Sequence, residues 1–207
     1  MEHHQQPKRS FFVPALLLLI VISVTFNVLL YSKSISREQE DRAQRGMAII
    51  SSGDNAKQHF QSVHDGIQAL LADIDIASRL AAKSDVAAAF HHAPDVAAFI
   101  QEAEAVSGEP FTPAKRDAGT FTSQVERSLQ ELGNHEGPLT EAERLYLQEL
   151  DSVYAKLKEA SDPFSFSDTT KEIAITVQAG GKWIEISRQL LNIMNEPENV
   201  EFSAEKK

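Results

Sequence analysis

The residues FFVPALLLLIVISVTFNVLLY, at positions 11–31, form an apolar run of 21 residues without a charged side chain. A helix of this length extends about 31 Å, which matches the roughly 30 Å hydrocarbon core of a bilayer. Because an unpaired backbone amide is very unfavourable in lipid, a run that crosses a membrane must be helical. The rest of the chain has no second run of this kind. The sequence therefore predicts a single transmembrane helix over 11–31, followed by one soluble domain.

Basic residues lie on both sides of this run. Lys8 and Arg9 precede it, whereas four basic residues follow it between positions 33 and 45. The count of basic residues alone favours an N-terminus outside the cell. However, a short tail followed by a long apolar run and a long domain has the layout of a signal anchor. Long domains also cross the membrane largely regardless of their charge. We therefore predict a single-pass protein of the cell membrane, with a cytoplasmic tail over 1–10 and an extracytoplasmic domain.

A cleaved secretory signal is the competing interpretation of the same run. Such a signal has an apolar core of only ~7–15 residues, with small residues before the cleavage site. Here the core is longer, and Ser32–Lys33–Ser34 is a poor cleavage site. The sequence favours an uncleaved anchor.

The composition of the part after the tail excludes several classes of function. Residues 10–207 contain 18 Lys and Arg against 29 Asp and Glu, a formal charge of −11. This argues against a nucleic-acid-binding protein, which would show a basic face, and against tight docking onto anionic lipid headgroups. The chain has no cysteine, which excludes disulfides, thiolate metal sites and a cysteine nucleophile.

Helical periodicity dominates residues 32–195, so we predict an all-α fold, a helical bundle with antiparallel packing. A long stalk helix is expected over 34–82. Either Gly46 and Gly53 interrupt it, or the membrane helix continues outward through both glycines as the stalk. Ser84 or Asp85 would then cap a short Ala-rich segment. Four shorter helices are expected after it: 95–107 beginning at Pro94, 120–132 ending at Gly133, a helix from Thr140 to a packed loop at 161–168, and 169–195. Thr140 and Glu143 have the spacing of a capping box.

The segment 169–195 has two interpretations. Alternating Ile173, Ile175 and Val177 before Gly180–Gly181 indicate a β-hairpin. A helix is favoured, because apolar residues also recur at three- and four-residue steps and a lone hairpin has no partner strand elsewhere. After Pro197 the chain is charged, so residues 196–207 are predicted to form a disordered tail.

No catalytic constellation is evident. His59 and His64 are five residues apart, about 140° round a helix, so they do not share a face as metal ligands would. His91–His92 lie at a helix break, and Asp73–Ile74–Asp75 is interpreted as a solvated face. Consequently we predict no catalytic, cofactor-binding or metal-binding residues, and a protein that is not an enzyme.

Polar residues within the apolar run suggest an association site. Ser23 and Asn27 are one turn apart on one helix face. Because polar side chains in lipid hydrogen-bond across helices, this face predicts a homodimer or contact with a partner.

Three groups of residues, in this order, resemble one family. They are His64–Ile67 with Leu70–Ala72; Pro138–Thr140 followed by Leu150, Tyr154 and Leu157; and Lys182–Ile186 with Leu190. They are similar to the N-terminal helical region of YpeB-like spore-germination membrane proteins. The resemblance implies a non-catalytic protein that stabilises and localises a cortex-lytic enzyme in Gram-positive endospore formers.

The sequence thus predicts a membrane-anchored, non-catalytic helical protein that binds or stabilises a partner protein at the outer face of a bacterial membrane. The resemblance makes a wall- or cortex-lytic hydrolase the expected partner, in sporulation or germination. An extracytoplasmic ligand-sensing bundle that signals through a partner is the alternative.

Overall fold

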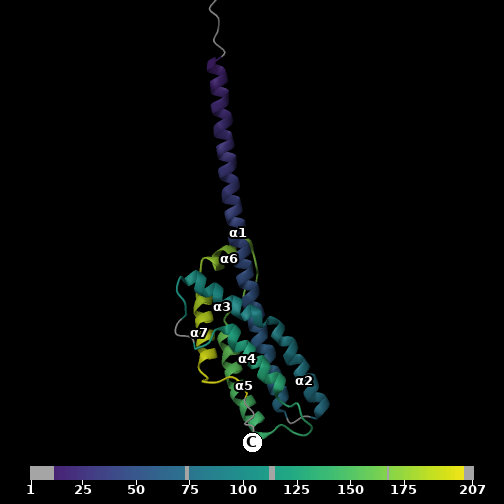
Figure 1. The fold of residues 1–207 in the computed structure, drawn as a ribbon. Coiled ribbons are helices and arrows are strands. Elements are labelled where there is room, and N and C mark those ends of the chain that lie inside the picture. Colours follow the sequence, from purple (N-terminus) through teal and green to yellow (C-terminus); the bar gives the residue numbers. More distant parts are fainter. Residues whose placement is uncertain (1–11, 73–74, 112–114, 167, 203–207) are drawn as a thin grey trace, which may run out of the picture. The chain divides into compact units, whose positions relative to one another are not determined.

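The computed structural model describes residues 12–72, 75–111, 115–166 and 168–202. Within these residues every regular element is a helix and there is no strand, which confirms the predicted all-α class. The elements, shown in Figure 1, are α1 (Phe12–Leu71), α2 (Ile76–Ala89), the 3-10 turn η1 (Phe90–His92), α3 (Ala93–Ser107), α4 (Ala118–Glu131), α5 (Glu141–Ser161), α6 (Lys171–Gln178) and α7 (Lys182–Asn195). The chain divides into two units, residues 1–42 and residues 43–207.

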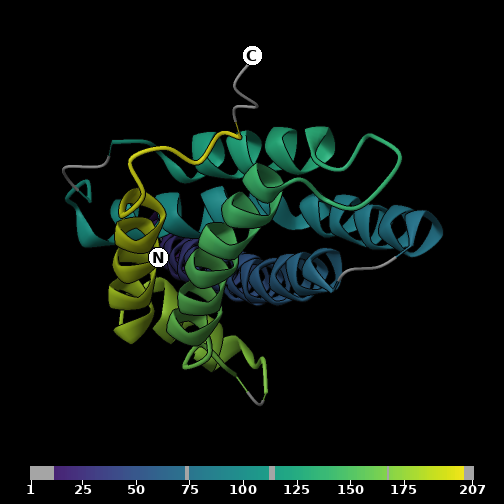
Figure 2. The same ribbon diagram turned by 90° about the horizontal axis from the view of Figure 1, so that it is seen from below.

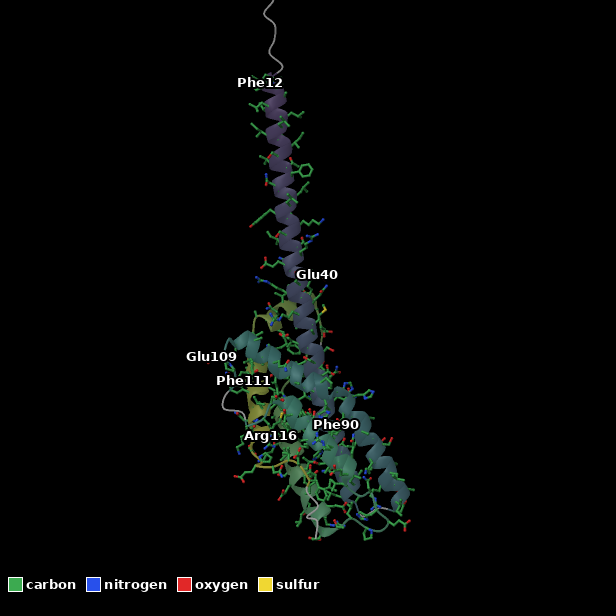
Figure 3. All side chains as sticks on the ribbon, viewed as in Figure 1. Phe12, Glu40, Phe90, Glu109, Phe111 and Arg116 are labelled. Atoms are coloured by element: carbon green, nitrogen blue, oxygen red, sulfur yellow. The ribbon has the colours of Figure 1, made fainter. Side chains whose placement is uncertain are left out.

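In the first unit, the described residues 12–42 belong to the outer part of α1. Figure 3 shows side chains projecting on all sides of the helix between Phe12 and Glu40. All the described residues of this unit are exposed, including the large apolar ones; Phe26 is 62% exposed and Leu19 is 64% exposed. Pro14 lies in the first turn, where its missing N–H costs little. This helix is long and apolar enough to cross a membrane.

In the second unit, residues 43–71 of α1 bury one face in the core. The buried apolar side chains include Ile49, Phe60, Val63 and Ile67, each 0% exposed. They recur at three- and four-residue steps, as expected for one face of a helix. The same helix is therefore exposed on all sides in one unit and half-buried in the other.

Gly46 and Gly53 do not interrupt α1, so the alternative of one continuous helix through both glycines is confirmed. Instead they allow close approach of neighbouring elements. A Cβ atom at Gly46 would overlap the carbonyl group of Ala174 in α6, and a Cβ at Gly53 would overlap the rings of Phe164 and Phe99. The intrinsic helix cost of about 1 kcal/mol for each glycine is offset by this packing.

The prediction of one stalk helix over 34–82 is wrong at its end. The helix stops at Leu71, and α2 begins at Ile76. Asp75 is the N-cap: its Oδ1 accepts hydrogen bonds from the backbone N–H groups of Ala77 (2.8 Å) and Ser78 (3.1 Å). The apolar periodicity continues across the break because both helices pack on the same core. Ser84 and Asp85, expected as caps, lie inside α2.

Other helix ends follow the local signals closely. Pro94 opens α3, and Gly108 ends it with φ 75°. The capping box at the start of α5 is confirmed: Thr140 Oγ1 accepts from Glu143 N–H, and the Glu143 carboxylate accepts from Thr140 N–H at 2.8 Å. The segment after α5 is a packed loop, as predicted, because Phe164 is only 3% exposed.

The segment 169–195 is helical, but it contains two helices rather than one. Gly180 and Gly181 adopt φ values of 117° and 136°, which residues with side chains rarely adopt, and they separate α6 from α7. Both interpretations of the sequence therefore missed part of the structure: the hairpin is wrong, and the continuous helix is broken at its two glycines.

The described part of the predicted disordered tail, residues 196–202, packs on the domain instead. Val200 is 3% exposed, and its carbonyl accepts a hydrogen bond of 2.8 Å from the Tyr146 hydroxyl. Phe202 N–H donates to Ser128 Oγ at 2.9 Å, and the ring of Phe202 contacts Tyr146 edge-on. Polar contacts also hold the segment: Arg116 donates to the carbonyl oxygens of Pro197 (2.9 Å) and Glu198 (2.8 Å). Residues 203–207 lie outside the described part.

The core of the second unit joins α1 to the later helices. In Figures 1 and 2, α7 lies beside α3 and α5, and α2 lies beside α4. Tyr154 of α5 is fully buried and packs against the rings of Phe60 and Phe121. Aromatic contacts of this kind bury large areas and dominate core energetics.

Candidate functional site

The histidines considered as metal ligands lie in different environments. His59 is completely buried, with Nδ1 3.0 Å from the carbonyl oxygen of Ala89 and its ring against Phe90 and Tyr154. Burial lowers the pKa of His59 to about 4. The ring is therefore neutral at pH 7 and serves the core.

His64 faces acidic residues instead. Its Nδ1 lies 3.5 Å from Asp65, and its Nε2 lies 3.5 Å from Asp151 of α5. No three His, Asp or Glu side chains of the described residues converge as metal ligands would. Asp73 and Ile74 lie outside the described part, and Asp75 is a helix cap.

A buried polar cluster, which the sequence analysis missed, holds the turn 132–140 between α4 and α5. Arg79 of α2 is 3% exposed and donates to the carbonyl oxygens of His135 (2.6 Å) and Gly137 (2.7 Å). Lys83, one helical turn later, donates to Gln130 O (3.0 Å), Leu132 O (2.7 Å) and Asn134 Oδ1 (2.5 Å). The sequence feature that could have predicted this cluster is the pair of basic residues at i and i+4 on an Ala-rich helix. Lys83 satisfies free carbonyls at the end of α4, and Arg79 satisfies carbonyls of the turn that follows it.

Glu143 completes this cluster from the side of α5. Burial would raise the pKa of its carboxyl group, but hydrogen bonds from Gly133 N–H (2.7 Å), His135 and Thr140 outweigh burial and lower the pKa to about 2. The hydrogen bond with Glu143 in turn raises the pKa of His135. Every charged group of the cluster is thus engaged with the turn, so the arrangement stabilises the fold and offers no free acid or base.

Among the concave surfaces of the described residues, two have a predominantly apolar lining and are candidate binding sites. The first, the α2–α4 groove, has a volume of about 270 Å³ and a mostly apolar lining. Leu80, Val86, Ala87, Phe90 and Leu129 form its apolar part, with Lys83, Ser84, Glu126 and Gln130 at its edges.

The second is an aromatic cavity beside the α6–α7 turn, also of about 270 Å³. The rings of Phe164, Phe166 and Trp183 line it together with Gly180 and Gly181. Trp183 is 4% exposed, and its Nε1–H donates to the carbonyl oxygen of Val177 at 3.0 Å. The indole is therefore held in place by the core.

The polar pair in the apolar run is exposed on α1. Asn27 donates its side-chain amide to the carbonyl oxygen of Ser23 at 2.9 Å, so one of its polar groups is satisfied within the helix. A contact through this face stays a prediction.

The residues that carry the family resemblance are mostly core residues. Ile67, Tyr154 and Leu157 are 0% exposed, and Leu190 is 1% exposed. They therefore have packing roles and do not form a shared site. No protein-family model, curated protein or solved structure matches this chain.

Proposed function

We propose that this protein is a non-catalytic, membrane-anchored helical protein that binds or stabilises a partner protein at the outer face of a bacterial membrane. The observation that carries the proposal is the outer part of α1: an apolar helix exposed on every side, which continues without a break into a folded acidic domain. An apolar helix of this kind is unfavourable in water and stable in lipid.

A membrane tether suits a binding role because it raises the effective concentration of a partner at the same surface. The acidic domain would steer a basic partner toward it. The resemblance described above makes a wall- or cortex-lytic hydrolase the specific partner proposed, with sporulation or germination as the setting. In the proposed orientation the N-terminus lies in the cytoplasm and the folded domain lies outside the membrane.

Four measurements test these parts separately. Carbonate washing should leave the protein in the membrane, and its release would contradict the anchor. Protease added to intact cells should digest the domain, whereas protection would place it inside. Cross-linking in native membranes should capture one partner reproducibly, and deleting either protein should lower the level of the other. Unchanged levels of both would contradict mutual stabilisation.

The aromatic cavity supports a second candidate, an extracytoplasmic sensor that signals through a partner. Its volume and three aromatic walls suit a small apolar ligand. A rise in the melting temperature of the purified protein with one member of a metabolite panel, absent in a Phe166→Ala variant, would favour this candidate. An enzyme ranks last, and turnover abolished by mutating His64 or Asp65 would be needed to favour it.

A further inference from the structure

Exposed apolar side chains extend the α2–α4 groove along α2. Only four large apolar side chains in the described residues 43–202 are exposed, and two of them, Ile76 (48%) and Leu80 (62%), lie one turn apart on this helix. Leu80 also lines the groove. Single exposed apolar residues are ordinary, but a strip continuous with an apolar groove indicates a contact surface.

The two charged side chains at the groove, Lys83 and Glu126, differ in whether they are available to a ligand. The Lys83 ammonium has three acceptors within the chain, at the end of α4, and therefore has no proton left for a ligand. Glu126 accepts one hydrogen bond from Gln130 (3.2 Å) and forms no ion pair within the described residues. The groove thus combines an apolar floor with one available carboxylate.

The construction of the groove also restricts the shape of its occupant. Both walls are helices, and the described residues contain no strand edge that would pair with an extended peptide. The occupant must satisfy its own backbone hydrogen bonds, as a helix does. Ile76, Leu80 and Ala87 follow one another at steps of four and seven residues, so they lie on one face of α2 that another helix can cover.

A helix in the groove could come from a second copy of this chain or from a different protein. The net charge of the domain decides between these two occupants. Residues 43–207 contain 15 Lys and Arg against 26 Asp and Glu, a formal charge of −11, so two copies would repel each other. We infer that the α2–α4 groove binds a basic amphipathic helix of the partner protein, with apolar side chains on Leu80, Phe90 and Leu129 and a Lys or Arg at Glu126. This inference rests on the proposed partner-binding function and names its site.

The chain has no cysteine, so single-cysteine variants give a clean test. Ala87→Cys places a thiol at the groove, and Ala81→Cys places one on an exposed position about 120° away round α2. The full chain, in phosphatidylcholine nanodiscs, is mixed with an 18-residue amphipathic Leu/Lys peptide that carries one activated disulfide. We expect the peptide to react at least tenfold faster at position 87 than at position 81, after correction with a small uncharged disulfide reagent. Equal corrected rates would overturn the inference.

A charge comparison makes the test specific. Added to Ala87→Cys, Glu126→Lys should slow the reaction at least fivefold and speed the reaction of a Leu/Glu peptide. Asp85→Lys makes the same charge change about 140° round α2 from Leu80 and should change either rate less than twofold. If Asp85→Lys acts as strongly as Glu126→Lys, only the overall charge matters and the inference fails. Circular-dichroism melting confirms that each variant is folded.

The inference about the groove and the proposed function can be contradicted by different results. If oxidation joins two copies of the Ala87→Cys variant through their introduced thiols faster than the peptide reacts, the groove belongs to a second copy and the inference is overturned. If Leu80→Glu leaves capture of the partner in native membranes intact, the groove is wrong but the proposed function stands. If the unmodified chain captures no partner, the proposed function fails while the peptide result still reports on the groove.

Discussion

The two parts of α1 belong to one continuous helix but differ in how far their side chains are exposed. Residues 12–42 are exposed on every side and include a long apolar run, whereas residues 43–71 bury one face against the other helices. The outer part carries large, branched and aromatic side chains all round. The inner part alternates large residues such as Phe60 with glycines that admit neighbouring elements. Backbone conformation is therefore the same in both parts, and what surrounds the side chains decides what each part does.

Phe60→Ala should have the largest effect on the second unit. Its ring is completely buried beside Tyr154, so its removal should lower the free energy of unfolding by about 3–5 kcal/mol. Urea denaturation followed by the fluorescence of Trp183, the one tryptophan, measures this. Phe26→Ala, in the exposed part, is the matched control and should leave the midpoint unchanged. Equal losses would mean that the outer part also packs on the domain.

Gly46→Val should lower the free energy of unfolding nearly as much as Phe60→Ala does. A side chain at position 46 would overlap the backbone of Ala174. Overpacking of this kind costs about 1–3 kcal/mol or more. Ser36→Val adds a β-branched residue at an exposed position of the same helix and should cost less than about 0.5 kcal/mol. The same urea titration compares the two, and a small effect at Gly46 would show that α6 moves away easily.

Leu19→Arg should affect only the outer part of α1, whereas the two preceding substitutions affect only the second unit. A charge at the centre of a transmembrane helix costs about 2.5–3.5 kcal/mol on insertion scales. The fraction retained after carbonate washing should fall, while the urea midpoint stays constant. Retention equal to that of a Leu19→Ala control would argue against a membrane span.

Acid should destabilise the second unit through His59. The pKa is about 4 in the folded state and about 6.5 when the chain is unfolded, so the neutral ring is favoured by folding. This stabilisation is complete above pH 6.5 and is lost as the pH falls toward 4; at pH 4.5 the loss is about 2.5 kcal/mol. His59→Phe should flatten the stability profile between pH 6.5 and 4.5. An unchanged slope would assign the acid sensitivity elsewhere.

Asp75→Ala should have the smallest effect and tests where the inner part ends. Loss of the two cap hydrogen bonds at the start of α2 should lower the urea midpoint by a small but measurable amount. Asp85→Ala, inside α2, is the control and should change the free energy of unfolding by less than about 0.5 kcal/mol. Equal effects would return the cap to the position that the sequence analysis favoured.

Most of the local structure was readable from the sequence. The all-helical class, the apolar run, the first turn of α3 with Pro94 and the capping box at Thr140 all depend on residues close together in the chain. Such signals are local because a helix satisfies its hydrogen bonds within itself. The end of α1 at Leu71 could not be predicted from the sequence, since apolar periodicity indicates a buried face and does not indicate a break between two helices that share one core.

Composition and hydropathy alone determined that this chain is helical, acidic and provided with one segment suited to lipid. Only the tertiary structure decided what the individual residues do: that Gly46 and Gly53 are contact points, that Gly180–Gly181 separates two helices, that Val200 docks the tail, and that Arg79, Lys83 and Glu143 meet at one turn. Most of these roles arise from contacts between segments far apart in the sequence. No local pattern records such contacts, because packing selects them only when the whole chain has folded.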